Sequence, residues 1–98
     1  MFTHLHLHTQ YSLLEGAIRV KQLAKALKER GFSACAITDH GNLFGAVEFY
    51  RALEKENLKP LIGMGAFVSE VPLAEHPDPN TNLRYFHTQL LCQNRQGY

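Results

Sequence analysis

The sequence predicts an α/β fold built on a parallel sheet, and three observations support this prediction. Short apolar runs with strand character alternate with two amphipathic helical segments, in the order β-α-β-α-β-loop-β. This order is compatible with either an open sheet or a barrel. Apolar residues make up 45% of the 98 residues, enough to bury a core in one small domain. Polar residues with reactive side chains follow the first two apolar runs, where parallel sheets carry their ligand sites.

The first half of the chain predicts two strands and the first helix. An alternating run predicts a strand over 2–7, and apolar residues at helical spacing predict a helix over 19–30, ended by Gly31. The apolar run over 33–38 is typical of a strand buried on both faces. Asn42 follows the next turn and is a candidate cap for the second helix.

The second half predicts one more helix and two more strands. The second helix is expected to bury one apolar stripe and to expose charged residues that include Glu48. Pro60 ends this helix, and 61–68 is predicted as the third strand. A proline-rich surface loop is expected over about 72–84, and the fourth strand over 86–92. The stripe expected on the second helix comprises Leu43, Ala46, Val47, Tyr50 and Leu53.

Composition excludes several classes of protein. The formal net charge is +1 and the basic residues form no sustained stripe, so this segment carries no signature of duplex binding through phosphate neutralisation. The cysteines, Cys35 and Cys92, occur singly in apolar runs, which is typical of reduced thiols. No apolar run approaches the ~20 residues of a membrane helix, and the N-terminus has no signal-peptide pattern. We therefore expect a cytoplasmic setting without a membrane partner.

Histidines alternate at the start of the chain. Because side chains alternate across a strand, His4, His6 and His8 share one face. Imidazoles at i and i+2 lie about 6.6 Å apart along a strand and can converge on one ion. His4 lies one step deeper and is expected to be a packed histidine. His6 and His8 are therefore the first candidate metal ligands.

Other candidate ligands follow later strands and loops. Glu15 lies in the loop after the first strand, His40 at the end of the second, and His87 early in the fourth. A mixed set of imidazoles and a carboxylate suits Zn, Mn or Fe. Asp39 is either a residue that orients a ligand or one that closes the turn. His76, among the prolines, is expected to be merely exposed.

Nucleophilic catalysis has little support from the residues. A Ser-His-Asp arrangement through Ser12 would need a glycine-framed nucleophile elbow, and Ser12 has none. The two cysteines lack the paired spacing of a zinc knuckle. No catalytic residue is therefore predicted beyond the metal ligands.

Four segments of the chain resemble one protein family. They read "HLHLHTQYSLLEG", "AITDHGNLFGAVEFY", "KPLIGMGAFV" and "YFHTQLLCQNRQGY" and extend nearly end to end. They are similar to the PHP (polymerase and histidinol phosphatase) domain, and more closely to the branch found at the N-terminus of bacterial DNA polymerase III α subunits. This resemblance implies a distorted seven-stranded, TIM-like β/α barrel with parallel strands and up to three metals at the strand ends. The chain over 1–98 would then be a single partial domain, the first half of that barrel, truncated.

The resemblance also assigns roles to residues. It places metal ligands at His6 and His8 of the HxH motif, at Glu15, at His40 of the TDH motif, and at His87. This sequence departs from the family pattern at "GMGA", where Gly65 stands in place of an expected acidic ligand that bridges two metals. Metal binding is therefore expected to be weak or substoichiometric, and the 98-residue piece alone is expected to be inactive.

Three functions remain open at this point. The first is the PHP region of a replicative DNA polymerase, acting as a metal-dependent phosphoesterase or 3′–5′ exonuclease or as a structural remnant of one. In that case DNA and other replicase subunits are partners through the parent chain, whose polymerase site lies elsewhere. The second is a stand-alone small-molecule phosphoesterase of the histidinol-phosphatase type, and the third is a non-catalytic structural module. An incomplete barrel leaves an open sheet edge, so self-association is expected.

Overall fold

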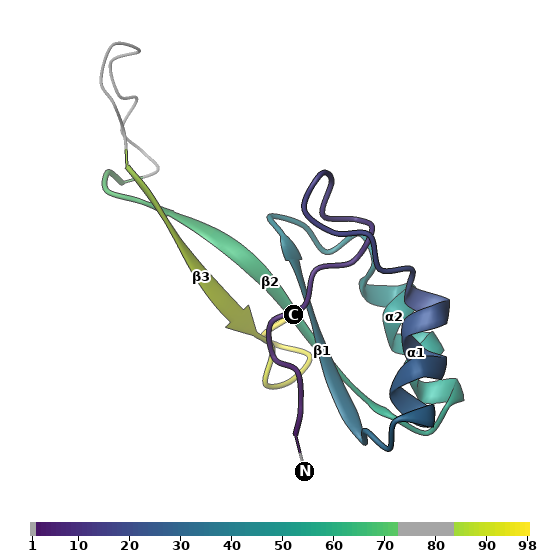
Figure 1. Ribbon diagram of the computed structural model, residues 1–98. Helices are drawn as coiled ribbons and strands as arrows, with labels where there is room; N and C mark the ends of the chain where they lie inside the picture. Colours follow the sequence, from purple (N-terminus) through teal and green to yellow (C-terminus); the bar gives the residue numbers. More distant parts are fainter. Residues whose placement is uncertain (1, 73–83) are drawn as a thin grey trace.

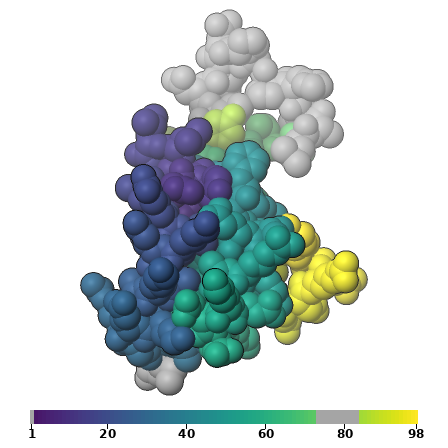
Figure 2. Space-filling model, turned by 90° about the vertical axis from the view of Figure 1, so that its right-hand side faces the viewer, coloured from purple at the N-terminus to yellow at the C-terminus, as the bar shows by residue number. Residues whose placement is uncertain are grey.

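The computed structural model describes residues 2–72 and 84–98, and these form a small α/β body with a long two-stranded extension (Figure 1). Two helices lie side by side on one face of the sheet, while β2 and β3 extend beyond the body. Figure 2 shows the two helices, in blue and teal, covering this face, with the C-terminal residues in yellow projecting beside it. The elements are α1 (Val20–Glu29), β1 (Ala34–His40), α2 (Ala46–Lys55), β2 (Lys59–Ser69) and β3 (Tyr85–Leu91).

The sheet has the order β1-β2-β3 and is mixed rather than parallel. Strands β1 and β2 run parallel, from the pair Ala34–Lys59 to the pair His40–Gly65. Strand β3 runs antiparallel to β2, which contradicts the expectation of an all-parallel sheet. Neighbouring parallel strands need a long crossover, usually a helix, and the residues between β2 and β3 carry prolines instead of a helical pattern. Most of the predicted loop over 72–84, including His76, lies outside the described residues.

The N-terminal segment lies alongside β1 in the parallel direction without forming a continuous ladder. The predicted strand over 2–7 is reduced to an isolated bridge at His4, whose carbonyl accepts from the N–H of Ala36 at 2.8 Å. The Leu7 carbonyl accepts from the N–H of Thr38 at 2.9 Å. The Leu7 N–H, however, donates to the Thr38 hydroxyl at 2.9 Å, so a side chain replaces a rung of the ladder.

The core lies between the helices and β1. Helix α1 buries Val20, Ala24 and Leu27 in the predicted phase, and the central residues of β1 are buried, as expected of a strand covered on both sides. The stripe predicted for α2 is partly wrong, because Val47 and Tyr50 are 57% and 47% exposed. Phe49 is fully buried instead, so the side of the helix that carries Phe49 faces the core.

The turn before α2 also differs from the prediction. The helix begins with Gly45 at the N-cap position, without a side-chain cap. Asn42 instead accepts from the N–H of Phe44 at 3.1 Å and donates its amide to the carbonyls of Tyr11 and His40 at 3.0 and 3.1 Å. Asn42 therefore fixes the turn after β1 and ties it to the loop at Tyr11, rather than capping the helix.

The architecture is consistent with part of a β/α barrel. The described residues form an open three-stranded sheet flanked by the N-terminal segment, and closure into seven strands stays a prediction. Within the described ranges, neither helix is long and apolar enough to cross a membrane.

Candidate metal centre

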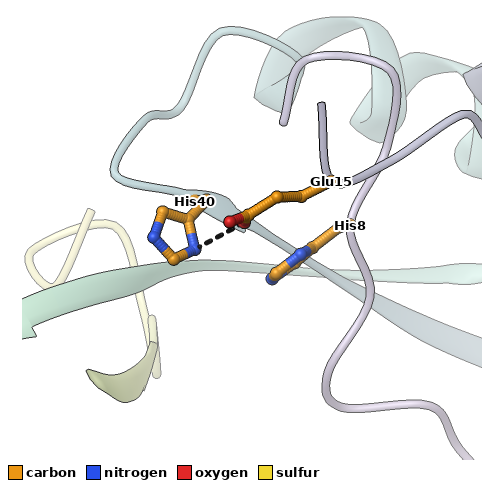
Figure 3. A group of neighbouring side chains, drawn as sticks. All are labelled: His8, Glu15 and His40. Carbon is orange, nitrogen blue, oxygen red and sulfur yellow. Dashed lines mark ion pairs between the residues drawn. The ribbon is translucent and has the colours of Figure 1, made fainter. Parts of the chain in front are cut away.

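Three potential ligands converge beside the carboxyl end of β1 (Figure 3). One ligand atom each from His8, Glu15 and His40 lies within 4.8 Å of the other two. Nδ1 of His40 is 3.1 Å from Oε2 of Glu15. The three side chains come from the N-terminal segment, the loop after it, and the last residue of β1. The convergence agrees with the rule that sites in α/β folds gather at the carboxyl ends of strands.

The two remaining candidates flank this group. The ring of His6 lies 5.1 Å from that of His8, and the ring of His87, on β3, lies 5.0 Å from that of His40. The rings of His8 and His40 are 5.7 Å apart, so the four imidazoles form a continuous row. All five residues singled out from the sequence are thus neighbours in space. His6, Glu15 and His87 are exposed, while His8 and His40 are half-buried.

A buried carboxylate fixes the loop that carries the candidates. Oδ1 of Asp39 accepts from the N–H of Thr9 at 2.6 Å and from the hydroxyl of Ser12 at 2.8 Å, and Oδ2 accepts from the Thr9 hydroxyl at 2.7 Å. The Ser12 oxygen in turn accepts from the N–H of His40 at 2.9 Å. Asp39 was expected either to orient a ligand or to close the turn. These hydrogen bonds favour the second role, because they tie the first loop to β1.

The same hydrogen bonds explain why Ser12 is not available as a nucleophile. Its hydroxyl is buried and engaged both by Asp39 and by the backbone of His40, so it is not presented as a nucleophile. His4 lines the same cavity as His6 and His8 but packs against aromatic side chains, with its ring 4.8 Å from Phe2 and 5.3 Å from Phe32. The interpretation of His4 as a packed histidine is therefore in line with its contacts.

One contact near the site was missed by the sequence analysis. The hydroxyl of Tyr11 donates to Oε2 of Glu48 at 2.6 Å, so Glu48 does not simply face solvent as expected. This hydrogen bond to a carboxylate, together with its negative charge, raises the pKa of Tyr11 above 10.0. The two residues lie in different quoted segments, 37 residues apart, and no spacing within either segment pairs them.

Gly65 lies directly beside His40 in the sheet. It is the strand partner of His40 and is buried, and its carbonyl accepts from the N–H of Gly41 at 2.8 Å. The positive-φ glycines of the described residues are Gly31 and Gly41, so Gly65 has an ordinary strand backbone. A Cβ built on Gly65 would have its nearest neighbours at 3.6 Å, which is normal contact. The strand could therefore carry a side chain at this position.

The donors fit a divalent cation. Two imidazole nitrogens and a carboxylate oxygen form a mixed set of the kind that binds Zn, Mn or Fe. Two ligands at ~2.1 Å from one ion in tetrahedral geometry are about 3.4 Å apart, close to the 3.1 Å between His40 and Glu15. Nε2 of His8 is buried and has no hydrogen-bond partner among the described residues, so this nitrogen is available to coordinate an ion. An open cavity of about 550 Å³ adjoins His6, His8 and Glu15.

Comparison with known proteins gives a consistent result. The family model described as "PHP domain" matches residues 4–98. DNA polymerase III subunit alpha of Helicobacter pylori strain J99 is 48% identical over 101 residues, and that of Campylobacter jejuni is 46% identical over 97 residues, each match covering 99% of this chain. The Aquifex aeolicus protein of the same name is 58% identical over 66 residues, or 67% of this chain. The chain spans only 8% of the Helicobacter and Campylobacter proteins and 6% of the Aquifex protein.

Proposed function

This chain belongs to the PHP domain family, and from that premise we propose that it is the N-terminal PHP region of a replicative DNA polymerase III α subunit. The similarity to proteins of that name over 99% of the chain supports this proposal. It favours a polymerase-associated domain over a stand-alone phosphoesterase of the histidinol-phosphatase type. DNA-directed DNA synthesis would then belong to the parent chain.

Within this region, His8, Glu15 and His40 would hold one divalent ion, with His6 and His87 as flanking ligands. The observation that carries this proposal is their convergence, together with the buried, unpartnered Nε2 of His8. A bound divalent metal supplies Lewis-acid chemistry and a more acidic water for phosphodiester hydrolysis. The chain's own contribution is to orient the donors, through the hydrogen bonds that fix the loop to β1.

The absence of a side chain at Gly65 limits what this site does. A carboxylate at that position would offset the repulsion between two cations, and glycine provides neither a ligand nor a charge. We therefore propose weak, at most single-ion binding, and negligible phosphoesterase or exonuclease activity of the 98-residue chain. Its role in the parent protein would be mainly structural.

The remaining proposals concern partners and setting. DNA and other replicase subunits would be met through the parent chain, in the cytoplasm. The chain itself would self-associate through the free edge of β3, since β3 is the outermost strand of the described sheet.

Calorimetric titration of the chain with Zn²⁺ and with Mn²⁺ tests the metal proposal. We expect at most one weakly bound ion and a loss of at least about tenfold in affinity for His8→Gln. The matched control is His4→Gln, which replaces a histidine outside the group and should bind like the unmodified chain. Tight binding of two or more ions with phosphodiester cleavage would show that Gly65 does not limit the site. Equal binding by both variants would rule out the proposed ligand set.

A further inference from the structure

Two buried side-chain polar atoms lack a hydrogen-bond partner among the described residues. One is Nε2 of His8, which belongs to the candidate metal centre, and the other is Oε1 of Gln89 on β3. Leaving a buried amide oxygen unpaired costs free energy, so such an atom in a folded protein requires an explanation. The sequence analysis did not single out Gln89.

Gln89 lies in the same row of the sheet as the metal centre. Gly65 is the strand partner of His40 on one side and of Gln89 on the other. Side chains paired directly across neighbouring strands project from the same face. The side chains of His40 and Gln89 therefore share a face, with only the bare backbone of Gly65 between them.

The amide of Gln89 also takes up the space that Gly65 leaves open. Nε2 of Gln89 lies 3.6 Å from the position that a Cβ on Gly65 would have. A 180° rotation about the last side-chain bond exchanges the amide oxygen and nitrogen without moving the backbone. After this rotation the oxygen lies over Gly65, on the face that His40 shares, and the nitrogen takes the position that the oxygen had.

We propose that the amide oxygen of Gln89 is an additional ligand of the metal centre, in the place of the side chain that residue 65 lacks. This inference rests on the proposed metal-binding function. An amide oxygen is a normal ligand for hard divalent cations and adds no charge. It completes the coordination of one ion, but it does not offset the repulsion of a second, which agrees with a single-ion site.

The test compares three variants by titration with Mn²⁺ and by thermal unfolding without metal. Gln89→Leu keeps the packing over Gly65 and removes the unpaired oxygen, so we expect about tenfold weaker binding with an unfolding midpoint that does not fall and rises if the oxygen is costly in the metal-free chain. Gln89→Glu places a carboxylate there and should bind about tenfold more tightly. Thr88→Val, on the adjacent residue and the opposite face of β3, is the matched control and should bind like the unmodified chain.

The outcomes separate this inference from the proposed function. If His8→Gln loses the ion while Gln89→Leu binds like the unmodified chain, the metal centre stands and Gln89 is not a ligand. If Thr88→Val weakens binding as much as Gln89→Leu, the effect comes from disturbing β3, and the inference is wrong. If the unmodified chain binds no Mn²⁺ at all, both the metal centre and the role of Gln89 are wrong.

Discussion

The carboxylate of Asp39 accepts hydrogen bonds from both the backbone N–H and the hydroxyl of Thr9, at 2.6 and 2.7 Å. Both residues are fully or almost fully buried. Each lies next to a candidate ligand, since Thr9 follows His8 and Asp39 precedes His40. This pair therefore sets the position of the N-terminal segment relative to the end of β1.

Replacing Asp39 by Asn should loosen that connection. The amide of Asn has one acceptor oxygen and turns an NH₂ group toward donors on Thr9 or Ser12, so at least one buried hydrogen bond is lost. We expect a loss of about 2 kcal/mol in the free energy of unfolding, measured by urea denaturation, and weaker metal binding by calorimetry. Glu54→Gln, on the exposed face of α2, controls for the change in charge. Unchanged stability of Asp39→Asn would mean that these bonds do not hold the loop.

Replacing Gly65 by Glu should strengthen metal binding. The backbone at this position accepts a Cβ, and a carboxylate there projects beside His40 with room gained by displacing the Gln89 amide. We expect at least about tenfold tighter Zn²⁺ or Mn²⁺ binding and a rise in the number of ions bound, measured by calorimetry. Gly65→Ala, which adds only the Cβ, should fold and bind like the unmodified chain. A folded Gly65→Glu variant with unchanged affinity would show that this position does not face the ion.

Alkaline pH should destabilise the fold through Cys35. Complete burial of its side chain raises the pKa of the Cys35 thiol from 9.0 to about 11. The unfolded chain therefore loses this proton at lower pH than the folded chain does. The stabilisation is fully present below pH 9 and is lost as the pH rises to about 11.

Urea denaturation at several pH values between 8 and 11 measures this effect. Cys35→Ala removes the thiol and should flatten the decline in unfolding free energy over that interval. Cys92→Ala, at the half-buried cysteine, is the control. An identical decline in the Cys35→Ala variant would assign the pH dependence to other groups.

The edge of β3 should promote association. Strand β3 is outermost in the described sheet, and Phe86 and Leu90 on it are each 54% exposed. Unpaired strand edges with apolar side chains are templates for pairing with another chain. We expect light scattering to give a mass above the 11.1 kDa of one chain, and Leu90→Lys to lower it. A monodisperse species of 11.1 kDa for the unmodified chain would show that the edge is protected.

Sequence patterns predicted the elements better than their contacts. The periodicity of α1 and the apolar run of β1 depend on local burial, and both lie within a few residues of their predicted positions. The grouping of His8 and His40 was also predictable, because strand ends bring such residues together. The direction of β3 was predicted wrongly, since strand periodicity is the same in parallel and antiparallel sheets.

Long-range polar contacts could not be predicted in the same way. The hydrogen bond between Tyr11 and Glu48 joins residues that are distant in sequence. The sequence around a charged helical residue such as Glu48 predicts only that it is exposed to solvent. The position of Gln89 over Gly65 depends on the register of β3 against β2, which no local pattern contains. Both contacts arise from tertiary structure alone.

The sparse bonding of the N-terminal segment has a consequence for how the protein opens. Strands β1, β2 and β3 form continuous ladders, whereas the stretch before Thr9, which carries His6 and His8, is attached to β1 within the described ranges only by the isolated bridge at His4 and by the bonds of Leu7. Segments held by few bonds detach at a fraction of the free energy needed to unfold the whole molecule. The candidate site thus lies on the boundary between the N-terminal segment and β1, which opens first. His8 then moves away from His40 while the sheet stays intact. An ion bound by both His8 and His40 would stabilise the attachment of the N-terminal segment to β1. It would therefore slow amide hydrogen exchange in this segment more than in the centre of β1.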